Sequence, residues 1–131
     1  MTARELTDAL DKFQAINYFW NSFGIPAYES TTVPEDANLG DFYITYEATI
    51  DSLDRAIPMS ASIWKLKTMS WDEISQKAEQ ISKALEKVYV VPMQVGYLYV
   101  TRGTPFAQRM SDEDDSTRRI YLNIMAEFLA P

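Results

Sequence analysis

Charged side chains gather in the last third of the chain, where they are the residue types with the most scope for chemistry. The acidic run 112–115 (DEDD) is surrounded by Arg102, Arg109, Arg118 and Arg119. Its carboxylates could bind Ca²⁺, but the run lacks the ligand spacing and the terminal glutamate of an EF-hand loop. Such a run is more typical of a solvated loop. The arginines suggest bidentate pairing with carboxylates, either within the loop or across a subunit boundary.

Other catalytic chemistry has little support in the residue types present. The chain contains no histidine and no cysteine, so it can form neither a disulfide nor a Ser-His or Cys-His nucleophile pair. It has no glycine-rich phosphate loop and no Gly-x-Ser-x-Gly elbow. The adjacent acids Asp72 and Glu73 are typical of a helix start, where they complement the helix dipole. We therefore expect no catalytic residue, no cofactor and no metal; a carboxylate-based enzyme and a small-ligand or nucleic-acid binding module are minor alternatives.

Length and composition indicate a single domain covering residues 1–131. Apolar residues make up 47% of the chain, with 8 Tyr, 6 Phe and 3 Trp, which is enough for a packed core. The net charge of −7 disfavours binding to nucleic acid, because it repels phosphate. Neither a signal-peptide core nor a membrane-spanning apolar run is found. We therefore expect a protein that is used in the cytoplasm or in something assembled there, with no membrane partner.

Hydrophobic periodicity predicts the elements that must position these side chains. Two capping boxes, Thr2 with Glu5 and Ser70 with Glu73, mark the starts of two helices. The first helix runs to about Ser22, and the second carries a regular apolar stripe. Alternation predicts strands at 42–48, 59–67, 95–101 and 118–128, with loops at 27–40 and 102–116. The expected fold class is α+β, in the order α-β-β-α-β-β: a four-stranded, mainly antiparallel sheet with two helices packed on one face.

The face of this sheet turned away from the helices has a mixed aromatic and polar composition. The side chains expected on it are Tyr43, Thr45, Glu47, Trp64, Tyr121, Asn123 and Met125. Such a face, and the strand edges beside it, are surfaces that proteins usually cover or protect. Oligomerisation would cover them.

Two segments are candidates for contacts between proteins. The first is the aromatic end of the first helix with the turn that follows, where Trp20, Phe23 and Tyr28 lie. Core packing is the simplest explanation of an aromatic helix face, but this cluster is more crowded than one sheet needs. The second is the 102–116 loop, whose mixture of aromatic, thioether, arginine and acid is typical of an interface. Its candidate residues, with the arginines that follow, are Phe106, Arg109, Met110, Arg118 and Arg119.

Six segments resemble, in the right order, the small tail terminator proteins of long-tailed bacteriophages. They are 19–28 (FWNSFGIPAY), 43–46 (YITY), 60–64 (SASIW), 70–74 (SWDEI), 103–110 (GTPFAQRM) and 118–124 (RRIYLNI). The resemblance rests on pattern and order along most of the chain, since none of these segments is a catalytic signature.

The resemblance implies an α/β fold with helices on one face of a sheet, and a structural role in the virion. Its members form a homohexameric ring at the head-proximal end of the tail tube, which ends tube polymerisation and joins the tail to the head. The partners would be further copies of the chain, the tail tube protein, and a head–tail connector or neck protein. The protein would be assembled in the host cytoplasm and located in the virion tail. A head–tail connector protein of the same virion is the alternative, because that group has a similar size and a related fold.

A closed ring requires two unlike, complementary patches on each copy. The segments 19–28 and 102–116 are the candidates for these patches. If acidic side chains face the lumen, DNA would pass through without specific binding, because like charges repel. Replacing the four acids at 112–115 by asparagine and measuring genome ejection tests this idea, and unchanged ejection would exclude this loop as the lining.

Overall fold

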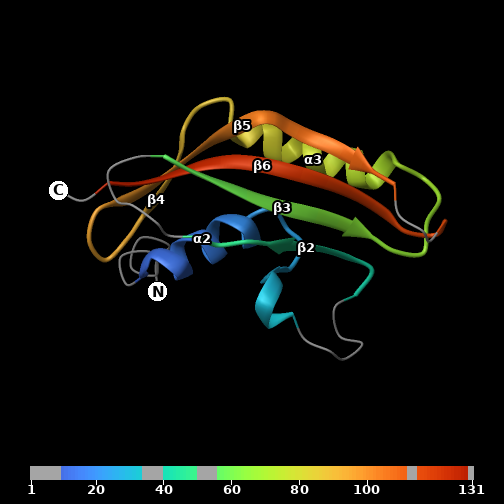
Figure 1. The fold of residues 1–131 in the computed structure, drawn as a ribbon, viewed down its shortest axis with the longest axis horizontal. Coiled ribbons are helices and arrows are strands. Elements are labelled where there is room, and N and C mark those ends of the chain that lie inside the picture. The colour runs from blue at the N-terminus through green and yellow to red at the C-terminus, as the bar shows by residue number, and fades with distance from the viewer. Residues whose placement is uncertain (1–9, 34–39, 50–55, 112–114, 130–131) are drawn as a thin grey trace.

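The protein is built around one curled sheet of six strands (Figure 1). This computed structural model describes residues 10–33, 40–49, 56–111 and 115–129. In chain order the elements are α2 Lys12–Asn21, β1 Ala27–Glu29, the 3₁₀ turn η1 Ser30–Thr32, β2 Phe42–Tyr46, β3 Ile57–Lys65, α3 Asp72–Ala84, β4 Tyr89–Pro92, β5 Tyr97–Met110 and β6 Arg118–Leu129. The strands lie in the order β1-β2-β3-β6-β5-β4. The pair β1–β2 is parallel, and all other neighbours are antiparallel.

Strand β6 lies inside the sheet, between β3 and β5, and shows strict alternation. Its buried side chains are Ile120, Leu122, Ile124, Ala126 and Phe128. The side chains between them are half-buried. The register with β3 places Ile57, Met59, Ala61 and Ile63 on the same buried face. Because side chains alternate along each strand, one face of the sheet is buried and the other is open.

Helix α2 lies on the buried face and contacts strands from both ends of the sheet. It begins with a capping box, in which Asp11 and Gln14 each accept a hydrogen bond from the other's backbone N–H. The Trp20 ring stacks on Tyr46 of β2 at 6.3 Å, while the Phe19 ring meets Tyr89 of β4 edge to face at 5.0 Å. Since β2 and β4 are four places apart in the strand order, the sheet must curl around the helix.

Helix α3 lies behind β5 and β6 in the view of Figure 1 and packs on β3, β5 and β6. Its buried stripe consists of Ile74, Ala78 and Ile81, extended by Leu85 just after the helix. Lys77 Nζ donates a hydrogen bond of 2.6 Å to the carbonyl oxygen of Phe23, which joins α3 to the turn after α2. Both helices thus contribute to one core on one side of the sheet.

The predicted four-stranded sheet is wrong, because the sheet has six strands in a mixed arrangement. Strand β1 lies within the predicted 27–40 loop, and the sequence predicts no strand at the position of β4. Strand β1, which pairs in parallel with β2, has only three residues. This is too short for an alternating pattern to be detected in the sequence. Strand β4 has four residues and ends in Pro92 at the edge of the sheet, where proline is tolerated.

The predicted loop at 102–116 is also wrong over most of its length, since β5 continues to Met110. Gly103 and Pro105 are residues that usually mark a loop. Here the strand absorbs them in an irregularity of register between Arg102 and Ala107, after which pairing with β6 resumes. The first predicted capping box, Thr2 with Glu5, and the acidic residues 112–114 lie outside the described residues.

Candidate functional site

The predicted contacts at the end of the first helix need correction. The side chains of Trp20 and Phe23 are 0% and 3% exposed, and both belong to the core. They are enclosed because the curled sheet brings Tyr46 and Tyr89 against the helix end. Of the three residues predicted there, only Tyr28 has a partly accessible side chain. Trp20 and Phe23 are therefore structural residues in this fold.

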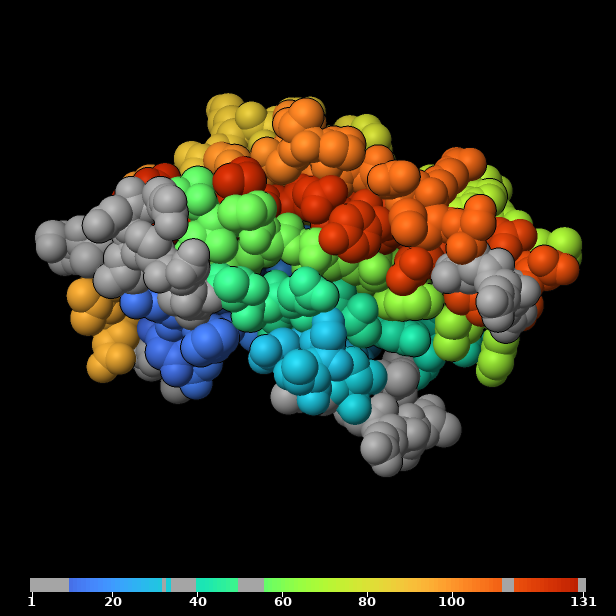
Figure 2. Space-filling view, in the orientation of Figure 1, coloured from blue at the N-terminus to red at the C-terminus, as the bar shows by residue number. Residues whose placement is uncertain are grey.

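The side of the sheet away from α2 and α3 has no helix over it among the described residues, and we call it the open face. Its strands form the front of the molecule in Figure 2, where β3, β6 and β5 are seen side by side. The strand registers place on it Tyr28, Tyr43, Thr45, Ser60, Ser62, Trp64, Gln108, Met110, Arg119, Tyr121, Asn123 and Met125. Glu47 reaches the same face, since its carboxylate accepts a hydrogen bond from Ser60 Oγ at 3.3 Å. The open face therefore contains all seven side chains that alternation predicted.

A row of four side chains crosses the open face over β2, β3, β6 and β5, and we call it the aromatic row. It consists of Tyr43, Trp64, Arg119 and Met110, which are cross-strand neighbours. The rings of Tyr43 and Trp64 are stacked at 6.4 Å, and the Arg119 guanidinium lies 4.9 Å from the Trp64 ring centre. Trp64 Nε1 donates to Thr45 Oγ1 at 2.9 Å. Rings and arginine held in this way form a preordered contact surface.

Tyr43 of the aromatic row has a neutral side chain at neutral pH. Burial raises the pKa of Tyr43 above its ordinary value of 10.0. Its hydroxyl is therefore protonated at neutral pH and can donate a hydrogen bond to a partner.

Arg109 and Arg118 lie on the other side of the sheet, against the start of α3. Their guanidinium carbons are 4.7 and 5.4 Å from the ring centre of Trp71. Arg118 Nε also donates to the carbonyl oxygen of Met69, and its Nη1 donates to that of Asp115. Within the described residues, Arg109 and Arg118 thus contact the Trp71 ring, and Arg118 also binds backbone carbonyls. The predicted pairing with the acids at 112–114 lies outside the described residues. Trp71, the residue that brings them together, was not recognised from the sequence.

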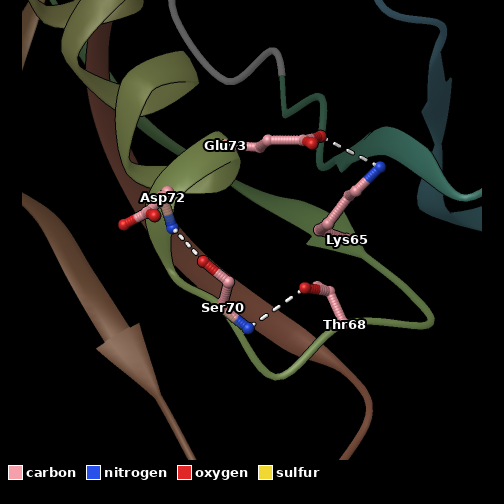
Figure 3. A network of polar contacts seen from close by, with 5 residues as sticks. All are labelled: Lys65, Thr68, Ser70, Asp72 and Glu73. Carbon is pink, nitrogen blue, oxygen red and sulfur yellow. Dashed lines mark hydrogen bonds and ion pairs between the residues drawn. The ribbon is translucent and has the colours of Figure 1, made fainter.

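The turn between β3 and α3 is held by a short polar network (Figure 3). Ser70 Oγ accepts a hydrogen bond from the backbone N–H of Asp72, and Thr68 Oγ1 accepts one from that of Ser70. The Glu73 carboxylate pairs with Lys65 Nζ at 3.1 Å. The predicted capping box is therefore not formed: Trp71 stands at the N-cap position, Ser70 Oγ binds the N–H of Asp72 and not that of Glu73, and the Glu73 carboxylate holds β3.

Phe106 lies half-buried beside a groove of about 280 Å³ between α3 and β5. Ser75 and Ser82 lie on the α3 side of this groove, and each accepts a hydrogen bond from an arginine of β5. Sequence reasoning did not find these serines, because on α3 they read as ordinary positions beside the apolar stripe. The pairing of 102–110 with β6 is what brings them to β5.

Three further observations bear on the kind of site present. No three His, Cys, Asp or Glu side chains among the described residues are placed so that they could hold a metal ion. None of the described helices combines the length and the apolar character needed to span a bilayer. Comparison with models of known protein families gave no match, and neither did comparison with curated proteins. Among the described residues, the open face and the groove between α3 and β5 are two candidate contact surfaces.

Proposed function

We propose that this chain is a structural virion protein, a tail terminator that forms a ring at the head-proximal end of a phage tail tube. In this role it ends tube polymerisation and joins the tail to the head. The proposal rests on the ordered resemblance of six segments to tail terminator proteins. The observation that carries it in the structure is the open face, whose aromatic row is ordered within the chain and left uncovered by both helices.

The geometry supplies the unlike surfaces that a ring contact needs. In a closed ring each copy uses one patch to bind a different patch on its neighbour. The open face is one such surface, with Tyr28, Met110 and Arg119 among the predicted contacts that lie on it. The side that carries α3 is chemically different, because its outer surface is mostly charged and polar. Further copies, the tail tube protein and a neck protein are the proposed partners.

Electron microscopy of particles produced without this protein tests the proposal. A tail terminator predicts tubes that are longer than normal and variable in length, because nothing ends their growth. Tubes of normal, uniform length that still join heads would exclude the proposal. Normal tubes that fail to join heads would instead identify the chain as a head–tail connector.

A further inference from the structure

The outer edge of β5 is uncovered along most of its length. Strand β4 pairs only with Tyr97, Leu98, Tyr99 and Val100. At Thr101–Arg102 and at Ala107–Met110, β5 pairs with β6 on one side and with no described strand on the other, while residues 103–106 lie in the register irregularity. Alternate N–H and C=O groups of a strand point to each side, so the regular stretch Ala107–Met110 presents unused hydrogen-bonding groups to a further strand.

At the opposite edge of the sheet, a side chain protects part of strand β1. At β1, Asn21 Oδ1 accepts a hydrogen bond from the backbone N–H of Ala27 at 3.0 Å. The amide nitrogen of the same side chain donates to the Ala27 carbonyl oxygen at 3.2 Å. One side chain thus occupies both main-chain groups of Ala27. The edge of β1 is thus partly occupied, whereas no strand among the described residues pairs with the outer side of β5 beyond Val100.

Two arginines flank the groove beside the free edge of β5. Arg102 Nη1 donates to Ser82 Oγ at 3.1 Å, and Arg109 Nη2 donates to Ser75 Oγ at 3.2 Å. The two serines are seven residues apart on α3, which separates them by about 10 Å along the helix axis. Neither guanidinium forms an ion pair with a described residue, although both are exposed. The Glu79 carboxylate lies on the α3 side of the groove.

We propose that this groove binds an extended, acidic segment of a partner protein, which adds to the free edge of β5 as a further strand. Carboxylates two or four residues apart on one face of a strand are about 7 or 13 Å apart, which brackets the spacing of the two serines that bind the guanidinium groups. The main-chain groups of β5 give the affinity, and Arg102 and Arg109 select the acidic side chains. Phe106 provides an apolar contact at the groove wall.

A protein segment fits this surface better than a nucleic acid does. A strand edge offers alternating donors and acceptors that match another peptide backbone. The net charge of −7 repels any anion, and it repels a polyphosphate more strongly than a peptide with two carboxylates, whose charges the two arginines can match. This inference does not depend on the proposed virion role, so an experiment can exclude one proposal without excluding the other.

Fluorescence anisotropy with the purified chain tests the charge selection. The probe is a labelled seven-residue peptide with aspartate at its second and sixth positions and threonine or valine elsewhere. The double variant Arg102→Gln with Arg109→Gln should bind it about tenfold more weakly, because two exposed charge pairs are lost. Glu79→Gln should bind it more tightly, since a repelling carboxylate is removed. Lys83→Gln with Lys87→Gln changes the net charge equally and should stay close to the parent chain.

Two further probes test the strand addition itself. Methylating alternate backbone nitrogens of the peptide on one edge should abolish binding, while methylating the other alternate set should leave it unchanged. Equal effects of both sets would overturn the proposal, as would equal binding of a single-stranded oligonucleotide of the same charge. Self-association of the chain that is lost in the double arginine variant would also overturn it, because a second copy would then occupy the groove.

Discussion

Gly103 lies where β5 passes closest to β6. A Cβ atom on this residue would be 2.9 Å from the carbonyl carbon and oxygen of Asn123, closer than real Cβ contacts allow. Asn123 cannot easily move, because its Nδ2 donates to the Pro105 carbonyl oxygen at 3.0 Å. We expect Gly103→Ala to lower the free energy of unfolding by about 1–3 kcal/mol, measured by urea denaturation. Thr101→Ala, at an exposed position of the same strand, is the control, and an equal effect of both would contradict the predicted clash.

Tyr46 provides a prediction about pH. Burial raises its pKa above the ordinary value of 10.0; the hydrogen bond donated by Asn17 opposes this shift, and the charge of Glu29 adds to it. Above about pH 10 the folded chain therefore keeps a proton that the unfolded chain has lost, so stability falls as pH rises through the raised pKa. Below that range the group has no effect on the pH dependence. Tyr46→Phe should flatten the loss of stability above about pH 10 in denaturation curves, and an unchanged slope would contradict this.

At the scale of elements, the start of α3 depends on Ser70. Its Oγ accepts the backbone N–H of Asp72, one of the groups that a helix start leaves without a partner inside the helix. Ser70→Ala should lower the free energy of unfolding by about 1 kcal/mol, as measured by thermal or chemical denaturation, because this hydrogen bond is lost. Ser70→Asp keeps an acceptor at this position and should restore most of the stability. If both variants lose the same amount, the hydrogen bond from Asp72 does not stabilise the start of the helix.

Elements with long, regular periodicity were predictable from the sequence, and those defined by pairing were not. The alternation of β6 and the apolar stripe of α3 each extend over ten or more residues, so local pattern identifies them. Strands β1 and β4 are too short to carry a pattern, and their strand character comes from their neighbours. In β5, Gly103 and Pro105 indicate a loop locally, but pairing with β6 overrides them.

The candidate contact surfaces also divide into those that a local sequence pattern predicts and those that depend on tertiary structure. Alternation along β2, β3 and β6 was enough to predict the open face, because a strand exposes every second residue. Helical periodicity makes core packing the simplest explanation of Trp20 and Phe23, but their complete burial depends on how far the sheet curls, which no local pattern predicts. The contacts of Arg109 and Arg118 with the Trp71 ring join residues that are far apart in sequence, and no local pattern predicts them.

At the scale of the whole molecule, the sheet separates two kinds of surface. The buried side holds both helices and the whole described apolar core. The open face holds ordered rings and an arginine, and β5 contributes to both, with Met110 and Gln108 on the open face and Arg102 and Arg109 facing α3. A long edge strand of this kind lets one segment contact two different partners. In the two proposals, the open face makes the contacts between copies and the groove binds a separate chain.

The open face yields the prediction that tests the ring contact most directly. Tyr121 lies at its middle, between Ser62 and Gln108, and is half-buried. Tyr121→Glu should prevent ring formation, because a charge would be placed in a contact between copies, where burying it is costly. Phe13→Glu makes the same change in charge at an aromatic residue that is 52% exposed on α2, away from this face, and should leave rings intact. Electron microscopy of tails assembled with each variant measures the result, with thermal unfolding to confirm that both fold; rings formed equally well by Tyr121→Glu would show that the open face does not make the contact.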